Sequence, residues 1–229
     1  MNVANPSPDA GKLDLSGVIL AGGKSRRMGG SHKALLPFPR EILIHRQIRL
    51  MNRVCSEIIL VTNEPKTFLP HVGSDVRIIT DYYAGKGPLA GVHAALSLAD
   101  RRNVWLVGCD MPFLSPEAAR LMLELKIAGD RDAVVPSFED RLQPLHGIYD
   151  KRCVRSIPVM FGSGQTKLVQ FLKTVLCETV EPSYFQGKGL DMKFILNFNT
   201  PDQYESCLKL EAQEEGRRGR EAEKRSHPS

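Results

Sequence analysis

Short apolar runs alternate along the chain with longer stretches whose apolar positions recur at helical spacing. The runs are rich in β-branched residues, which favours strands, and turn-forming residues separate them. The predicted strands span residues 17–21, 57–62, 76–80, 103–107 and 132–136. The predicted helices span residues 42–54 and 88–99, and further helices begin at Ser115, Thr166 and Thr200. The chain therefore predicts strands and helices in regular alternation.

This alternation predicts an α/β fold with a mostly parallel central sheet and helices on both of its faces. The crossovers between parallel strands are expected to be right-handed. In such sheets ligands bind just beyond the carboxyl ends of the strands. The loops that directly follow strands are therefore the places to search for function.

The two ends of the chain differ from the alternating middle. Residues 1–15 are rich in Asn, Pro, Ser, Asp and Gly, which predicts a disordered leader. Residues 211–229 contain five acidic and five basic residues, which predicts a charged, disordered tail. Residues 16–210 are left as a single α/β domain, the length expected of one hydrophobic core.

Composition narrows the class of partner. The 229 residues carry a net charge of +5 at neutral pH, a mild excess that suits anionic small molecules. The basic residues form no stripe interleaved with aromatics, so we expect no nucleic-acid binding. We also expect no membrane segment, because no apolar run approaches about 20 residues. The five isolated cysteines have no metal-site spacing and indicate a reducing, cytoplasmic setting.

The loop after the first predicted strand, Leu20-Ala21-Gly22-Gly23-Lys24-Ser25-Arg26-Arg27-Met28-Gly29-Gly30-Ser31-His32-Lys33, combines glycines with cations. The adjacent pair Gly22 and Gly23 lets the backbone approach a ligand, and Arg27 and Lys33 could face phosphate oxygens. A flexible turn with solvated charges is the alternative. Neither the P-loop pattern nor the dinucleotide fingerprint matches this loop.

The same loop resembles the signature L-x-G-G-x-S-x-R-M-G-x-x-x-K of the molybdenum cofactor guanylyltransferases, the MobA family of NTP transferases with a Rossmann-like fold. The resemblance implies a magnesium-dependent transfer of GMP from GTP to molybdopterin. It implies that the loop wraps the nucleotide and that Arg27 and Lys33 contact phosphate. His32 stands where the family usually has Asp, which could change the orientation of the neighbouring lysine.

The ends of the second and third predicted strands carry Asn63 and Asp81. Either residue could simply serve turn chemistry, but the resemblance implies that both lie at the nucleoside. Gly87 belongs to the stretch G-P-L-A-G, which opens a helix whose N–H groups suit phosphate or ribose. L-A-G-G, which includes Leu20 and Ala21, together with G-P-L-A-G resembles the guanylyl branch and favours GTP over CTP.

Asp110 ends a buried predicted strand within Cys109-Asp110-Met111-Pro112. A carboxylate there suits Mg²⁺, which takes one or two carboxylates plus phosphate oxygens of the substrate. Capping of the next turn is a comparable interpretation by position alone. The resemblance to the family's C-D-x-P motif favours the metal role. Cys109 is expected to pack rather than to act as a nucleophile.

The later half resembles the acceptor side of the family. Within Gln143-Pro144-Leu145-His146-Gly147-Ile148-Tyr149, His146 could contact the pterin or its phosphate, or could be a core residue of an apolar strand. Lys167 at the start of a predicted helix is a further acceptor candidate. Asn197 and Asn199 could approach the metal or acceptor, or could only cap the last helix. Residues 38–42 depart from the family's usual G-K-P-L turn.

The sequence thus predicts an enzyme that uses GTP and molybdopterin, with Arg27, Lys33 and Asp110 as catalytic residues. The open alternatives are a molybdopterin cytidylyltransferase, a sugar-nucleotide transferase and a non-catalytic nucleotide or cofactor carrier. We expect transient contacts with proteins that deliver the cofactor or mature molybdoenzymes. The resemblance covers about residues 15–208, and its nucleotide half is the more specific part.

Overall fold

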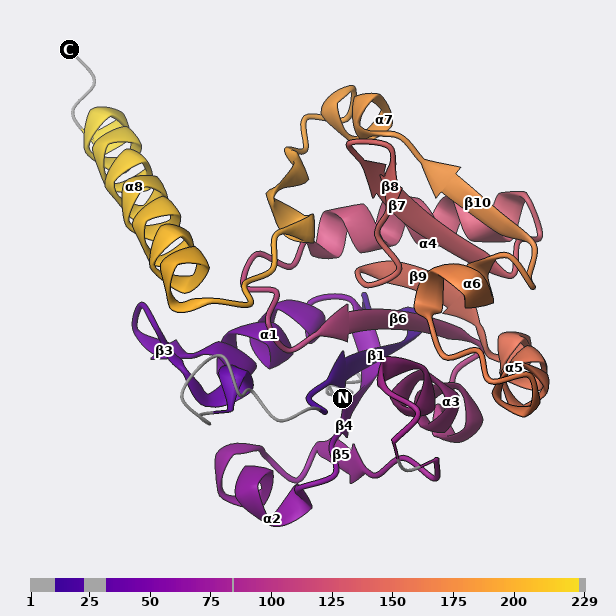
Figure 1. Cartoon of the computed structure of the whole chain (residues 1–229). Coiled ribbons are helices and arrows are strands. Elements are labelled where there is room, and N and C mark those ends of the chain that lie inside the picture. The colour runs from indigo at the N-terminus through magenta and orange to yellow at the C-terminus, as the bar shows by residue number, and fades with distance from the viewer. Residues whose placement is uncertain (1–10, 23–31, 84, 227–229) are drawn as a thin grey trace, which may run out of the picture.

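The computed structural model describes residues 11–22, 32–83 and 85–226, and from residue 218 onward it describes only the backbone. Eight strands form one twisted sheet at the centre (Figure 1). These strands are β1 (Leu13–Leu20), β4 (Cys55–Val61), β5 (Val76–Ile79), β6 (Asn103–Gly108), β7 (Ala133–Phe138), β8 (Arg141–Leu142), β9 (Gly147–Asp150) and β10 (Cys177–Val180). A separate two-stranded sheet joins β2 (Pro37–Phe38) to β3 (Glu41–Ile42).

The strand order of the large sheet is β10-β7-β9-β6-β1-β4-β5, and β8 pairs with β7. β9 runs antiparallel to β6 and β7, and β8 is also antiparallel to β7, whereas the other neighbours pair in parallel. The prediction of a mostly parallel sheet is therefore confirmed. The chain leaves β1 toward β4 and β5 and then returns to β6 on the other side of β1. This reversal opens a crevice beyond the carboxyl ends of β1 and β6.

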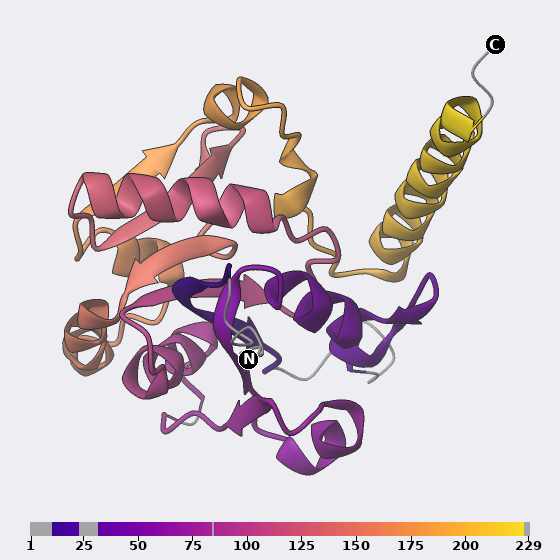
Figure 2. The same cartoon turned by 180° about the vertical axis from the view of Figure 1, so that it is seen from behind.

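Helices cover both faces of the sheet, as predicted (Figures 1 and 2). They are α1 (Leu43–Met51), α2 (Pro65–Phe68), α3 (Pro88–Leu98), α4 (Pro116–Ala128), α5 (Ile157–Gly162), α6 (Leu168–Leu172), α7 (Pro182–Gln186) and α8 (Pro201–Ser226). Short 3₁₀ helices are η2 (Lys33–Leu35), η3 (Leu69–His71), η4 (Lys151–Ser156) and η5 (Met192–Ile195). One core cluster joins β1 and β6 to α1, α4 and α7, and a second joins them to α3, α5 and α6.

Local signals explain where the main helices begin. The Ser115 hydroxyl accepts a hydrogen bond from the Ala118 N–H at 3.1 Å, and Pro116 occupies the first turn of α4, as predicted. The Thr200 hydroxyl accepts from the Gln203 N–H at 3.3 Å at the start of α8. In the described part of the chain no helix is both long and apolar enough to cross a membrane.

The two ends differ from the sequence prediction. β1 already begins at Leu13, inside the segment predicted as a leader. α8 continues to Ser226 rather than ending near residue 210, and it projects from the body of the molecule (Figure 1). Tyr204, Cys207 and Leu208 face a small apolar cluster, and Glu211 is buried beside Arg46. The predicted tail is therefore helical from its first residue, Glu211, which the charge pattern did not reveal.

Residues 38–42, which depart from the family's usual turn, form the hairpin of β2 and β3. Arg40 adopts a left-handed backbone conformation at its turn, with φ of 71°. Phe38 is buried against Phe113 with ring centroids 5.9 Å apart.

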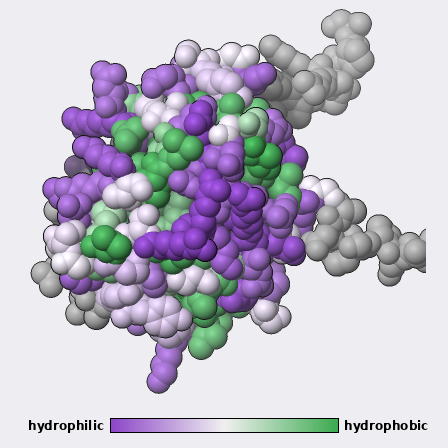
Figure 3. Space-filling view, turned by 90° about the vertical axis from the view of Figure 1, so that its right-hand side faces the viewer, coloured by the Kyte–Doolittle hydropathy of each residue, from purple (hydrophilic) through white to green (hydrophobic). Residues whose placement is uncertain are grey.

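The side of the molecule near α5, α6 and β10 shows hydrophobic residues scattered among hydrophilic ones (Figure 3).

Candidate nucleotide site

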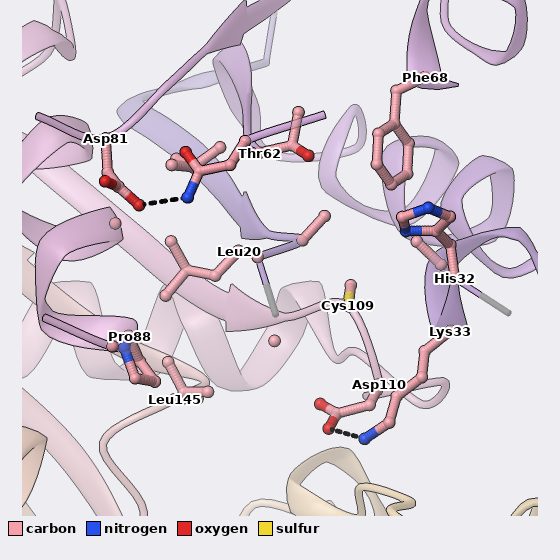
Figure 4. Close-up of a pocket in the computed structure, with 18 of the residues that line it drawn as sticks. Leu20, His32, Lys33, Thr62, Phe68, Asp81, Pro88, Cys109, Asp110 and Leu145 are labelled. Carbon is pink, nitrogen blue, oxygen red and sulfur yellow. Dashed lines mark hydrogen bonds and ion pairs between the residues drawn. The ribbon is translucent and has the colours of Figure 1, made fainter. Parts of the chain in front are cut away.

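A cavity of about 450 Å³ lies beyond the carboxyl ends of β1, β4 and β6, at the crevice that the strand order predicts (Figure 4). Eight of the residues predicted for nucleotide binding or catalysis line it: Leu20, Ala21, Gly22, Lys33, Asn63, Asp81, Gly87 and Asp110. Gly23 and Arg27 lie outside the described residues. Segments from the first half of the chain thus converge on one site, because parallel strands end at the same edge of the sheet.

An amide–carboxylate pair occupies one end of the cavity. The Asn63 side-chain N–H donates to Asp81 Oδ2 at 2.8 Å, joining the loops that follow β4 and β5. The Thr62 hydroxyl, on a side chain that is buried, accepts from the Glu64 N–H at 3.1 Å and fixes the same turn. Asp81 retains further acceptor capacity, since a carboxylate has about four lone-pair sites. This end could therefore recognise hydroxyl or N–H donors of a ligand.

The start of α3 forms a second wall. Gly87 has φ of 66° and ψ of −158°, a backbone region that only glycine adopts readily. A Cβ at Gly87 would meet no atom within 4 Å, so backbone conformation rather than space requires glycine there. A Cβ on Gly91, one turn into α3, would lie 3.3 Å from the Leu20 side chain. Glycine at both positions lets α3 begin at the cavity and pack on the end of β1.

The opposite end of the cavity holds an ammonium group among oxygen atoms. Lys33 Nζ donates to Asp110 Oδ2 at 3.1 Å, to the Phe198 carbonyl at 2.9 Å and to Asn199 Oδ1 at 2.8 Å. The Lys33 and Asp110 side chains are 14% and 17% exposed. Low exposure strengthens the attraction between the two charges relative to a surface pair. Figure 4 shows this pair on the far side of Leu20 from Asp81.

The neighbours of Asp110 fix its place. The Cys109 N–H donates to the Leu20 carbonyl at 3.1 Å, so the loops after β1 and β6 are joined. The Phe198 N–H donates to the Asp110 carbonyl at 3.2 Å. Burial and then the Asp110 charge raise the pKa of the Cys109 thiol to about 12. The thiol is therefore protonated at neutral pH, as a packing residue would be.

His32 lines the cavity next to Lys33. Its Nε2 lies 3.2 Å from Glu64 Oε2, and its ring meets Phe68 edge-on with centroids 5.5 Å apart. A histidine at this position thus connects the end of the glycine loop to the loop after β4. The usual Asp of the family would face Glu64 as a second negative charge.

The acceptor candidates are spread over different places. Asn199 contacts Lys33 at the edge of the cavity, whereas Lys167 and Asn197 are exposed and do not line it. His146 is fully buried, directly before β9, with φ of 64°. Its Nε2 accepts from the Ser115 N–H at 3.0 Å, and burial lowers its pKa to about 3. His146 is therefore a neutral core residue in this structure, which matches the second of its two sequence interpretations.

Some lining residues were not among the predicted site residues. Thr62 and Phe68 line the cavity but carry no distinctive pattern in the sequence, and Leu145 lies in the segment where His146 was the candidate. Gln47 is a functional candidate that does carry a sequence signal. It lies among the buried positions Leu43, Ile44 and Met51 of an amphipathic helix, where a polar residue needs a specific partner.

The comparison with known proteins agrees with this geometry. Residues 17–180 match the MobA-like NTP transferase domain, a stretch that begins within β1 and ends with β10. The chain belongs to the MobA-like NTP transferase family. The predicted family and the predicted nucleotidyltransferase fold are thereby confirmed.

Individual relatives of this MobA-like transferase align with it over most of the length of both chains. A probable molybdenum cofactor guanylyltransferase of Pelotomaculum thermopropionicum is 38% identical over 82% of this chain and 89% of its own. One of the same name from Clostridium perfringens is 33% identical over 85% of this chain and 96% of its own. The crystal structure of molybdopterin-guanine dinucleotide biosynthesis protein A from Archaeoglobus fulgidus shares the fold, with a TM-score of 0.75 at 21% identity over 86% and 99% of the two chains.

Proposed function

We propose that this MobA-like transferase moves GMP from GTP to molybdopterin and releases pyrophosphate. The cluster of Lys33, Asp110 and Asn199 at one end of the cavity carries the proposal, because it places a cation and hard oxygen atoms where a triphosphate would end. The relatives named molybdenum cofactor guanylyltransferase support the choice of reaction. The proposed setting is the cytoplasm, with transient contacts to proteins that deliver or collect the cofactor.

The residues present fit a magnesium ion. Mg²⁺ keeps several waters and binds through one or two carboxylates together with substrate phosphate oxygens. Asp110 supplies one such carboxylate at the cavity wall. The Asn199 side-chain oxygen lies nearby, because it accepts a hydrogen bond from the same Lys33 ammonium group as Asp110. Asp110 would hold the ion, with Asn199 as a further oxygen ligand. When bound, the ion would neutralise phosphate charge and orient the triphosphate.

The protein's own contribution is positioning and charge. A terminal phosphate oxygen of molybdopterin forms a bond to the α-phosphorus of GTP, and the bond from that phosphorus to the α–β bridging oxygen breaks. The electron pair leaves with pyrophosphate. Such a nucleophile is already ionised at neutral pH, so no general base is required of the protein. Lys33, already oriented by three oxygen atoms, offsets the negative charge on the triphosphate.

The other end of the cavity would hold the nucleoside. The Asp81 carboxylate, oriented by Asn63, suits ribose hydroxyl or guanine N–H donors. The sequence L-A-G-G and the stretch G-P-L-A-G support guanine over cytosine. Among the acceptor candidates, only Asn199 lies beside the proposed reaction centre, so Lys167 and Asn197 remain predictions for a more distant part of molybdopterin.

Pyrophosphate release tests the proposal directly. The purified protein is incubated with magnesium, molybdopterin and one of GTP, CTP, ATP or UTP. Release with GTP alone supports guanylyl transfer, and release with CTP alone would replace it with cytidylyl transfer. Binding of GTP without release from any nucleotide would favour a carrier. Asp110→Asn, which keeps the side-chain shape, should abolish release while the unfolding temperature stays near that of the wild type.

A further inference from the structure

The loop between β6 and α4 carries Asp110 but belongs to neither element. Residues 109–115 form turns, so no helical or strand hydrogen-bond ladder fixes them. The position of the carboxylate therefore depends on what holds the backbone of this loop. Backbone hydrogen bonds to Leu20 and Phe198 hold Cys109 and Asp110, and side chains from α1 hold the carbonyl groups on either side of them.

Gln47 holds the loop on both sides of Asp110. Its side-chain N–H groups donate to the Gly108 carbonyl at 2.8 Å and to the Met111 carbonyl at 2.9 Å. Gln47 is fully buried. Its side-chain oxygen has no partner within the described ranges, and leaving a buried acceptor unpaired costs free energy. The amide is therefore placed for its two donated hydrogen bonds.

The neighbouring Arg46 holds the next carbonyl of the same loop. Its Nε donates to the Pro112 carbonyl at 2.8 Å, and its guanidinium lies 4.9 Å from the centre of the Phe38 ring. A terminal nitrogen donates to Glu211 Oε2 at 2.8 Å, and the two side chains are only 12% and 3% exposed. Glu211 lies on α8, so the C-terminal helix fixes the guanidinium from the opposite side.

We propose that Arg46 and Gln47 are positioning residues for Asp110, and that Glu211 joins α8 to the same hydrogen-bond network. We call the contacts of Arg46, Gln47 and Glu211 the positioning network. The inference rests on the proposed role of Asp110 as the metal ligand. Two adjacent residues of α1 donate hydrogen bonds to three carbonyl groups within two positions of Asp110 in the sequence: those of Gly108 at the end of β6, Met111 and Pro112. The segment that leads into α8 also reaches the site, because Phe198 and Asn199 contact Lys33.

The chain offers a matched control on the same helix. Arg40 Nε lies 3.2 Å from Glu215 Oε1, four residues beyond Glu211, but the Arg40 side chain is 82% exposed. This pair joins α8 to the β2–β3 turn, and among the described residues it makes no hydrogen bond or ion pair with the loop of Asp110. Glu215→Gln therefore removes an ion pair of α8 and leaves the positioning network unchanged.

The variants Gln47→Met, Arg46→Met, Arg46→Lys and Glu211→Gln test the proposal beside Glu215→Gln. We expect the first two to lower kcat about 10- to 100-fold, the effect of small misplacements away from the chemistry, with the KM for GTP changed less than about 3-fold. Arg46→Lys keeps a positively charged donor group, without the fork of the guanidinium, and should recover part of the loss. Glu215→Gln should match the wild type.

Two readouts do not need turnover. Mn²⁺ binding in the presence of GTP, followed by electron paramagnetic resonance, should weaken about 10-fold in Gln47→Met and Glu211→Gln. Amide hydrogen exchange of residues 108–115 should become faster in the same variants, while α3 stays unchanged. A folded Gln47→Met with wild-type kcat, Mn²⁺ affinity and exchange would overturn the positioning role.

The same readouts separate this inference from the proposed function. If the wild type releases no pyrophosphate from GTP, guanylyl transfer fails, but faster exchange of residues 108–115 and weaker Mn²⁺ binding would still support positioning. If the wild type is active and Gln47→Met unfolds, Glu211→Gln decides, because it keeps the side-chain shape and removes only the charge of one partner of the pair with Arg46. Unchanged Mn²⁺ binding and unchanged hydrogen exchange in Glu211→Gln would show that α8 has no part in the positioning network.

Discussion

Lys33 Nζ lies 3.1 Å from Asp110 Oδ2, although 77 positions separate the two residues in the chain. The contact joins the end of the glycine-rich loop to the loop after β6. It also brings a fixed cation beside the carboxylate that we assign to magnesium. Both groups would therefore act on the same phosphates: Lys33 through its own positive charge, and Asp110 through the magnesium ion that it would hold.

Lys33→Met should lower kcat/KM for pyrophosphate release about 100-fold or more, because it removes a charge-assisted contact to the triphosphate. Steady-state kinetics with GTP measure this effect. Lys66, exposed on α2, provides the control, and Lys66→Met should retain wild-type kinetics. Equal activity of Lys33→Met and the wild type would contradict the role of Lys33.

Asp81→Asn should weaken GTP binding about 10-fold, with a smaller change in kcat, since a charged acceptor at the nucleoside end becomes neutral. Calorimetric titration with GTP and with GDP gives the affinity. Asn63→Ala should weaken binding in the same direction, because Asp81 then loses the donor that orients it. Unchanged affinity in both variants would place the nucleoside elsewhere.

Exchanging His32 for Asp, the residue usual in the family, should reduce rather than improve nucleotide binding here. The new carboxylate would face Glu64, whose Oε2 now lies 3.2 Å from His32 Nε2. A second change, Glu64→Gln, should restore affinity because it removes the repulsion. The affinities of the single and double variants for GTP form a double-mutant cycle, and additive effects would show that the two positions do not interact.

Stability should fall on mild acidification partly because of His146. Burial lowers its folded-state pKa to about 3, while an unfolded histidine has a pKa of about 6.5. The unfolded state therefore binds the proton first, so this stability is complete above pH 6.5 and declines as the pH falls toward 3. Urea unfolding between pH 7 and about 4.5 should show a smaller decline in His146→Gln than in the wild type. Parallel curves would contradict this assignment.

The buried pair of Lys126 and Asp150 should contribute stability far from the site. Lys126 Nζ donates to Asp150 Oδ2 at 2.9 Å, and both side chains are 3% exposed. Lys126→Met would leave Asp150 with Arg102 as its remaining cationic partner. Because the carboxylate stays paired, we expect a loss of about 2 kcal/mol in the free energy of unfolding, which is less than the usual cost of breaking a buried pair. Chemical denaturation measures it, and GTP binding should stay unchanged.

The sequence predicted the strands and helices of the nucleotide half because each has a strong local signal. β6 is a continuous apolar run, α4 has a serine cap followed by proline, and Gly87 marks a backbone turn. The spacing of strand and helix then placed Asn63, Asp81 and Asp110 at one edge of the sheet. Local signals failed for α8, where single long-range contacts such as Arg46 with Glu211 order a charged segment.

By itself the sequence determined the family, the α/β architecture and the residues at the strand ends, because periodicity and motifs are properties of neighbouring positions. Only the tertiary structure decided which residues meet across long separations. It placed Lys33 among oxygens of Asp110, Phe198 and Asn199, buried His146 in the core and brought Gln47 beneath the loop of Asp110. Those outcomes depend on packing and on pairing buried polar groups, which no local pattern encodes.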